Sequence, residues 1–416
     1  MKRDKIILVM LFVVPICSGI ISSYYFSKAD RKVEVRQKID VKDEVIGTNT
    51  LSIYLETAEG SGEYTLSDSD IFLQDGYYFN EEKSKCENGG LLSFDKSSGK
   101  VRMSALASDK CYVYFDKEIT SLGNFADYIK SLYTEQGVDN LYLHDNTLTN
   151  GARDNSYRYA GPHDAVNNFV CFGSDTATCS NDDLYRIIGV FDDQVKLIKY
   201  DYATKEQLRT GGDYTSEENP RTQYKGSQSK ISTYYWNKNT SNGNWNEGRL
   251  NTVNLNGTYL TNLGKTWTDK IATTTWYIGG LSMSIGQRSN ARDVYGYELG
   301  LRKVNKPYDA KIGLMYLSEY FYGALPTHWT KPGWNSDETK DYSSAVNDNW
   351  MYMGHYDWAI TTEPNATSIY IVNWSGNLSN AFPDSNEGVR PTFNLTSNVE
   401  LTSGSGSREN PFRIKT

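Results

Sequence analysis

The stretch GVRPTFNLTS, residues 388–397, alternates apolar and polar residues as a strand does, but an arginine and a proline interrupt its beginning. Because proline has no backbone N–H, Pro391 removes one hydrogen bond from any sheet ladder and is tolerated at an edge or a bulge. The stretch therefore predicts an edge or bulged strand that closes the final sheet of the chain. It also raises the question of why Arg390 stands directly before that proline.

Further strands precede this closing stretch. Apolar runs bounded by turn residues predict strands, and they read NFVCF, LYRIIGVF, QVKLIKY, IATTTWYIGG, KIGLMY, SIYIVN and NLSNAF. Asp192 and Asp193 separate the second run from the third and predict a hairpin turn there.

Helical spacing occurs at two places. The segment SLGNFADYIKSLYTEQG has apolar residues three and four positions apart and predicts one helix in a linker over residues 118–154. Residues 250–263 predict two short helices broken at Asn256 and Gly257. Together with the strands, these helices predict an α+β domain over residues 155–416.

Residues 49–117 have a different character. Short runs such as LSIYLE, DGYYFN, GGLLSF, GKVRMSAL and CYVYFD alternate in period two and are separated by Gly, Asn, Asp and Ser. They predict a small all-β domain with a thin core, which a disulfide would help to hold.

Four cysteines follow the N-terminal segment: Cys86, Cys111, Cys171 and Cys179. In an exported chain an even number of cysteines predicts disulfides, and three connectivities are open to four cysteines. Their clustering favours Cys86 with Cys111 and Cys171 with Cys179. Free thiols are the alternative. No pair has the close spacing of a zinc site, so no metal is predicted there.

The N-terminus predicts a membrane segment. Three basic residues precede an uncharged, mostly apolar stretch over residues 6–26, which is long enough to cross a bilayer as a helix. Residues 1–28 are therefore expected to be a single-pass anchor in the cell membrane, with residues 29–48 as a stalk and the bulk of the chain outside the cytoplasm. A cleaved signal peptide, which would make the protein secreted, is the alternative.

The charge distribution bears on the partners. Four basic residues and one aspartate give residues 1–28 a net charge of +3, whereas the whole chain carries −8. The remainder is strongly acidic and repels phosphate backbones, so no nucleic-acid partner is expected.

Six blocks of sequence carry a resemblance to a known family: YRIIGVF, QVKLIKY, RLNTVNLNGTYL, KIGLMYLSEY, WAITTEPNATSIYIVNWSGN and GVRPTFNL. In this order they resemble the bacterial domain-of-unknown-function 6273 family over about residues 155–414. Members often have Leu-Arg-Ser-Pro after the tryptophan of the fifth block, where this chain has residues 360–364 instead. The closing motif is also remotely similar to C-type-lectin-like folds. That resemblance implies a structural Arg390, which would enter the core and donate to carbonyls or a carboxylate. A ligand-binding Arg390 is the alternative.

The tripeptide Glu363, Pro364, Asn365 is the one with which mannose-type C-type lectins hold calcium and sugar hydroxyls. Carboxylate and amide oxygens suit Ca²⁺. Those lectins also need an Asn-Asp pair after a tryptophan, and here Trp374 is followed by Ser375. Ca²⁺ is therefore only an alternative, and no cofactor is predicted.

Aromatic residues are the other binding candidates, because flat apolar faces suit sugar rings and protein hot spots. They lie in or next to the loops over residues 326–358 and comprise Trp329, Trp334, Trp350, Tyr352, Tyr356 and Trp358. The alternative is that most of them fill a core poor in leucine and isoleucine.

No catalytic motif is found. The chain has no nucleophile elbow, phosphate-binding loop or dinucleotide fingerprint, and its four histidines lack a metal-ligand frame. The sequence predicts a non-catalytic, membrane-anchored binding or adhesion protein of a bacterial surface, with a glycan or protein ligand. A glycan- or cell-wall-active enzyme, which would need two inward carboxylates, is one alternative. A passive structural component of a surface assembly is another.

Overall fold

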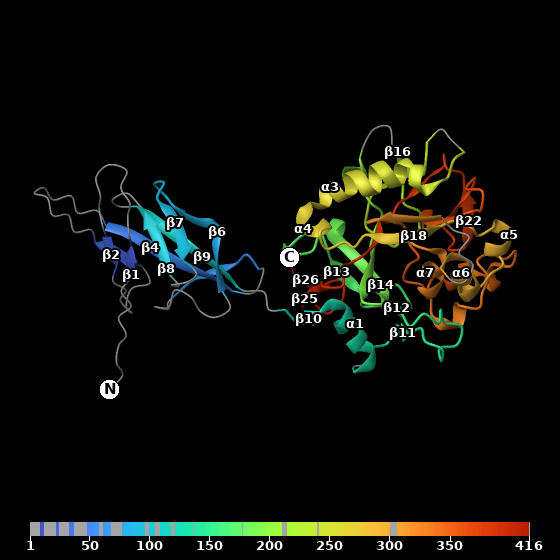
Figure 1. Ribbon diagram of the computed structural model, residues 1–416, viewed down its shortest axis with the longest axis horizontal. Helices are drawn as coiled ribbons and strands as arrows, with labels where there is room; N and C mark the ends of the chain where they lie inside the picture. The colour runs from blue at the N-terminus through green and yellow to red at the C-terminus, as the bar shows by residue number, and fades with distance from the viewer. Residues whose placement is uncertain are drawn as a thin grey trace, which may run out of the picture. The chain divides into compact units, whose positions relative to one another are not determined.

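The computed structural model divides the chain into two compact units, shown in Figure 1. Unit 1 comprises residues 1–120 and 176–178, and unit 2 comprises residues 121–175 and 179–416. The structure describes residues 9–11, 22–24, 33–36, 48–57, 61–67, 77–95, 100–104, 109–117, 121–135, 137–176, 178–209, 214–238, 241–299 and 306–415.

Unit 1 is built on one sheet. Its strand order is β3 (Val33–Arg36), β4 (Thr48–Glu56), β9 (Lys110–Lys117) and β6 (Tyr77–Cys86), and β5 (Tyr64–Leu66) also pairs with β4. A separate hairpin consists of β7 (Leu91–Asp95) and β8 (Lys100–Ser104).

The core of unit 1 lies between this sheet and the β7–β8 hairpin. Strand β9 alternates buried and partly exposed residues, as a strand with one covered face does. Its Val113 and Phe115 are fully buried and cluster with Val101 and Met103 of β8. The core is small, so unit 1 depends on a covalent link as well.

Both predicted disulfides are confirmed. Cys86 of β6 stands opposite Cys111 of β9 in the antiparallel register, and the two are bonded. Cys171 is bonded to Cys179, eight residues further along the chain.

The predicted transmembrane anchor is wrong for the residues that can be described. Within residues 6–26 these form β1 (Val9–Leu11) and β2 (Ser22–Tyr24), which pair antiparallel. Across the described ranges, no helix combines the length and the apolar character needed to cross a bilayer. This finding overturns the single-pass assignment, and the rest of residues 1–32 lies outside the described residues. A run rich in valine, isoleucine and leucine suits a strand as well as a helix, so its hydrophobicity alone does not decide between them.

One large sheet of unit 2 contains the predicted hairpin and the closing stretch. Its order is β11 (Leu141–Leu143), β12 (Tyr157–Tyr159), β14 (Leu184–Phe191), β15 (Gln194–Lys199) and β24 (Thr392–Asn394), and β13 (Phe169–Cys171) also pairs with β14. Asp192, at φ 53°, and Asp193 form the turn between β14 and β15. Strand β24 is the last strand in this order, and Pro391 precedes it.

The second large sheet of unit 2 carries the sites described below. Its order is β16 (Tyr214–Glu218), β17 (Ile231–Tyr235), β23 (Asn386–Gly388), β20 (Asp357–Thr362), β21 (Ile369–Val372) and β22 (Leu378–Ala381). Two smaller groups complete the strands: β18 (Thr274–Ile278) with β19 (Lys306–Ala310), and β10 (Gly123–Asn124) with β25 (Glu400–Ser403) and β26 (Arg413–Ile414).

The helices of unit 2 are short. They are α1 (Phe125–Thr134), α2 (Lys205–Leu208), α3 (Leu260–Leu263), α4 (Lys265–Thr268), α5 (Met283–Gly286), α6 (Ala291–Glu298) and α7 (Leu317–Tyr322). Single 3₁₀ turns occur at η1 (Asn181–Asp183), η2 (Trp245–Glu247), η4 (Pro326–His328), η5 (Glu338–Lys340) and η6 (Tyr342–Ala345).

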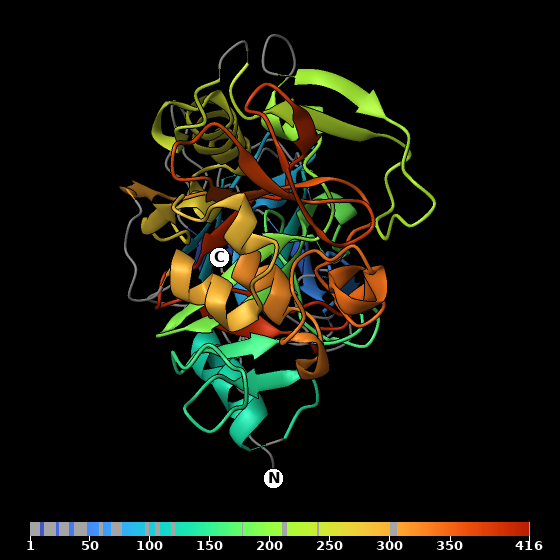
Figure 2. The same ribbon diagram turned by 90° about the vertical axis from the view of Figure 1, so that its right-hand side faces the viewer.

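The expected break at Asn256 and Gly257 does not occur. A π-helix, η3 (Leu250–Tyr259), runs through both residues and continues into α3. The Asn256 amide donates to the Ile312 carbonyl at 2.8 Å and accepts from the Ile312 N–H at 2.9 Å. This long-range contact is consistent with the wide helical turn. Figure 2 shows the yellow η3–α3 segment at one end of unit 2 and the teal α1 at the other.

The predicted α+β class is wrong, because strand residues dominate. They make up 34% of the structure against 21% for helix, and they form several sheets. The helices, of four to ten residues, connect the sheets rather than form a layer of their own.

Arg390 answers the question raised by the closing stretch. Its side chain is 1% exposed and donates to the carbonyls of Lys199 and Met351, both at 3.0 Å, and to the Asp357 carboxylate at 3.3 Å. Lys199 ends β15 of one large sheet, and Asp357 begins β20 of the other. The guanidinium therefore joins the two sheets in the core of unit 2.

Candidate functional site

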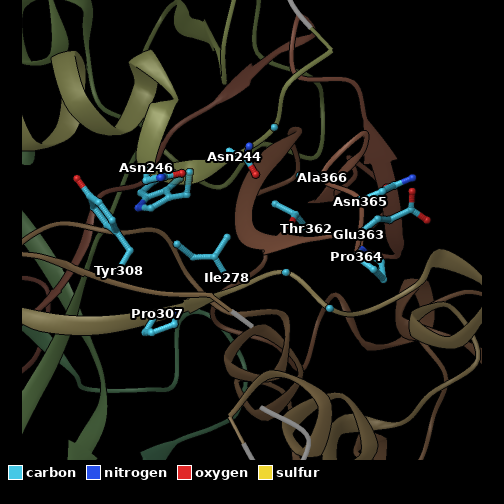
Figure 3. A pocket seen from close by; sticks show the side chains of 14 residues that line it. Asn244, Asn246, Ile278, Pro307, Tyr308, Thr362, Glu363, Pro364, Asn365 and Ala366 are labelled. Atoms are coloured by element: carbon cyan, nitrogen blue, oxygen red, sulfur yellow. The ribbon is translucent and has the colours of Figure 1, made fainter. Parts of the chain in front are cut away.

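A pocket of about 460 Å³ opens at the end of β20. Four separate segments line it: residues 243–246 with η2, residues 278–280 after β18, residues 307–308 in β19, and residues 362–366 after β20. Figure 3 shows Tyr308 and Ile278 on one side and Glu363, Pro364 and Asn365 on the other. A volume of this size is in the usual range for small-molecule sites.

The loop after β20 forms one rim of the pocket. The Glu363 N–H donates to the Ser368 carbonyl at 3.0 Å, and the Ala366 N–H donates to the Glu363 carbonyl at 2.9 Å, so the loop is a closed turn. Ala366 has φ 53°, a conformation that is costly for a residue with a side chain. The tripeptide picked out in the sequence therefore lies on a fixed turn at the pocket.

Glu363 and Asn365 each use one side-chain oxygen in a hydrogen bond within the protein. One Glu363 carboxylate oxygen accepts from the Met283 N–H at 3.0 Å, and the Asn365 side-chain oxygen accepts from the Thr367 hydroxyl at 2.8 Å. In the view of Figure 3 both side chains extend away from Ile278. They lie at the rim of the pocket.

Two positions of the wall that adjoin this loop need glycine. The Gly243 N–H donates to the Ala366 carbonyl at 2.8 Å, and a Cβ on Gly243 would lie 2.5 Å from that oxygen. Gly279 has φ +87°, and a Cβ there would lie 2.6 Å from the Thr362 hydroxyl. The segments at Gly243 and Gly279 therefore each lie directly against residues 362–366.

The residues that line the pocket provide polar side chains and an aromatic surface. They offer the half-exposed Tyr308 ring, the amides of Asn244, Asn246 and Asn365, and the Glu363 carboxylate. Among the described residues that line the pocket, Glu363 is the sole carboxylic acid, and none is Lys, Arg or His. Trp245 also lines it and is 2% exposed, and its indole N–H has no hydrogen-bond partner.

The aromatic candidates separate into two groups. Trp329, Trp350 and Trp358 are at most 1% exposed, and each indole N–H donates to a backbone carbonyl. Tyr352, 3% exposed, donates to the Trp374 carbonyl at 2.6 Å. These four side chains fill the core of unit 2.

The remaining two aromatic candidates reach the surface. Trp334 is 44% exposed, and Tyr356 is half-buried. Neither lines the pocket. Of the eight binding candidates from the sequence, the pocket gathers Glu363 and Asn365.

The sequence did not point to Tyr308, Asn244, Asn246 or Ile278. They come from three separate segments of the chain, and a single sequence gives no signal that brings these segments together. The nearest signal is the pair Gly279 and Gly280, which marks a tight backbone at the end of β18.

A second polar cluster lies at the other end of β20. His355 is 2% exposed, neither ring nitrogen has a hydrogen-bond partner, and its Nε2 lies 3.8 Å from a Glu218 carboxylate oxygen. Burial, followed by the charge of Arg221, lowers the pKa of His355 to about 4. Burial, followed by the charge of Glu218, raises the pKa of Glu387 to about 8.

Arg221 borders this cluster on its outer side. Its guanidinium lies over the Tyr356 ring at 5.2 Å and over the Trp374 ring at 5.5 Å. Arg221 is exposed, and Trp374 is 37% exposed. The outer wall of the cluster is thus an arginine held between two aromatic rings.

Three potential metal-ligand atoms lie within 4.8 Å of one another, as far as the chain is described, at Cys86, Asp109 and Cys111. The two sulfurs are bonded to each other, so they are not metal ligands. The Asp109 carboxylate instead accepts from the N–H groups of Asn88 and Gly90.

Comparisons with known proteins identify no relative. The chain matches no family model, no curated protein and no solved structure. The resemblance to the domain-of-unknown-function 6273 family therefore stays a prediction.

Proposed function

We propose that the protein is a non-catalytic binding protein and that the pocket at the end of β20 binds a short stretch of glycan. The observation that carries the proposal is the composition of the lining, in which the Tyr308 ring stands opposite a rim of amide and carboxylate groups. A sugar presents an apolar ring face and paired hydroxyls, which match an aromatic ring and amide side chains.

The charges of the lining narrow the ligand class. With no cation among the described lining residues, phosphorylated or sulfated ligands would find no counter-charge. A neutral or amino sugar is favoured, because Glu363 offers one carboxylate and the amides both donate and accept.

The same lining speaks against hydrolysis in this pocket. Glycosidases of the common kind use two carboxyl groups about 5 to 10 Å apart. Glu363 is the single carboxylate in the described lining, and one of its oxygens already accepts from Met283. Binding without turnover is therefore the better-supported function.

The test is a titration of the purified full chain with neutral, amino and sulfated oligosaccharides, with binding measured by calorimetry. Tyr308→Ala should weaken binding by at least about 1 kcal/mol, roughly fivefold, because it removes the exposed ring. Tyr133→Ala is the matched control, since Tyr133 is 38% exposed on α1 and does not line the pocket. A chain that binds none of these sugars, or that hydrolyses one of them, would refute the proposal.

A further inference from the structure

The ion pair between Lys196 and Glu319 lies in the core of unit 2. Lys196 Nζ is 2.5 Å from Glu319 Oε1, and the two side chains are 6% and 1% exposed. Lys196 belongs to β15 in one large sheet, and Glu319 belongs to α7, 123 residues further along the chain. The fold therefore brings an amine and a carboxyl group from distant parts of the sequence into contact, away from solvent.

Aromatic rings surround the Lys196 amine. Its Nζ lies 4.8 Å from the ring centres of both Trp276 and Tyr316 and 5.8 Å from that of Phe191. An ammonium group has three N–H donors, and among the described residues Glu319 provides its one hydrogen-bond acceptor. Burial lowers the pKa of Lys196, although the charge of Glu319 opposes this effect. Because a buried ion pair is costly to desolvate, a reaction that neutralises both groups relieves that cost.

We propose that Lys196 and Glu319 condense to an intramolecular isopeptide bond, so that one amide links β15 to α7. After one ammonium proton has passed to Oε1, the Nζ lone pair attacks Cδ of the Glu319 carboxyl group, and a C–N bond forms. A second proton of the nitrogen then passes to Oε1, the C–Oε1 bond breaks with its electron pair, and that oxygen leaves as water. The third proton stays on the amide nitrogen, and the step needs no oxidant, reductant or co-reactant.

The geometry suits this attack. A carboxyl C–O bond is about 1.2 Å long, so a nitrogen 2.5 Å from Oε1 lies no more than about 3.7 Å from Cδ. Groups held about 3–3.5 Å apart are close enough to react. The second oxygen of Glu319, Oε2, accepts from the Tyr316 backbone N–H at 2.9 Å. This donor stabilises the negative charge that develops on Oε2 during the attack.

The bond has a consequence for the stability of unit 2. The amide closes residues 196–319 into a covalent ring, whereas the disulfide between Cys171 and Cys179 joins residues only eight positions apart. A link that closes a longer segment removes more conformational freedom from the unfolded chain. The isopeptide bond is therefore the stronger of the two covalent constraints on this unit.

Intact mass spectrometry of the purified full chain, unfolded and with its disulfides reduced, tests the bond. With the N-terminal residue determined by sequencing, the wild-type mass should be lower by one water than the mass calculated from the sequence. Tandem mass spectrometry of a tryptic digest should find the peptide that contains Lys196 joined to the peptide that contains Glu319.

Lys196→Met should restore the calculated mass, because it removes the attacking amine. Lys199→Met is the matched control, with circular dichroism verifying its fold. Lys199 is buried in the same strand, but its Nζ donates to the Asp182 backbone carbonyl at 2.8 Å, so the loss of one water should remain. A wild-type chain of full calculated mass would overturn the proposal, and so would a missing water that maps to another site or persists in Lys196→Met.

Discussion

Arg390 is the residue on which the junction of the two large sheets of unit 2 depends. Its guanidinium pairs with the buried Asp357 and donates to two carbonyls. Arg390→Met should destabilise the protein by about 3–5 kcal/mol, because it removes the donor to two buried carbonyls and the partner of the Asp357 carboxyl, whose pKa burial raises to about 7. Urea unfolding followed by tryptophan fluorescence measures the change.

The exposed ion pair between Lys130 and Asp193, at 2.8 Å, provides the control for Arg390. Lys130→Met should change stability by less than about 1 kcal/mol, because solvent screens the pair. If Arg390→Met cost no more than the control, the guanidinium would not hold the sheets together.

Because Lys199 is buried, we expect the stability of the protein to depend on pH in the alkaline range. Burial lowers the pKa of Lys199 to about 8, although its ammonium donates to the Asp182 carbonyl at 2.8 Å. Between pH 8 and about 10.4 the unfolded chain holds this proton and the folded chain does not, so the Lys199 contribution to stability rises with pH. Below pH 8 both states are protonated, and the cost of burying the charge is fully present.

Lys199→Met should therefore stabilise the protein at pH 7, with the gain shrinking as the pH rises from 8 to 10. The measurement is the difference in urea midpoint between variant and wild type at each pH, which cancels the titration of tyrosines. A difference that stayed constant over this range would show that Lys199 keeps its ordinary pKa in the fold.

At the scale of elements, the turn after β20 and the segment at Gly243 must meet without a side chain between them. Gly243→Ala places a Cβ 2.5 Å from the Ala366 carbonyl oxygen, so the backbone has to shift. The expected cost is about 1–3 kcal/mol, as for other overpacked positions. Gly296→Ala is a control with the opposite sign, because Gly296 lies within α6 with nothing within 4 Å, and alanine there should stabilise by about 0.5–1 kcal/mol. Thermal unfolding measures the change in stability of each variant. If both variants were destabilised, or both stabilised, the close approach of Gly243 to Ala366 would not limit the side chain at this position.

The elements also show which features a sequence can reveal. The β14–β15 hairpin and the disulfide between Cys171 and Cys179 are local, so turn residues and spacing were enough to predict them. The π-helix at Asn256 was missed, because the bonds of Asn256 reach Ile312, 56 residues away. Of the four segments that line the pocket, the sequence pointed to the one that contains Glu363 and Asn365, because the four segments meet only in the folded sheets.

At the scale of the whole molecule, the two units have separate cores and should unfold separately. Their spectroscopic signals are separable, because all nine tryptophans lie between Trp236 and Trp374 and thus in unit 2. Tryptophan fluorescence should follow unit 2 alone, whereas far-ultraviolet circular dichroism should follow both units. Each unit also contains one disulfide, so each transition can be shifted on its own.

Replacing Cys86 and Cys111 with serine should destabilise unit 1 by about 3 kcal/mol, because the unfolded segment between them gains conformational freedom. The transition seen by circular dichroism but not by fluorescence should move to lower urea, and the fluorescence transition should stay in place. Replacing Cys171 and Cys179 with serine should have the reverse effect, moving the fluorescence transition by about 2–3 kcal/mol, because the segment closed by that disulfide is shorter. If fluorescence and circular dichroism shifted together in either variant, the two units would be one cooperative structure and the division at residue 120 would have no thermodynamic meaning.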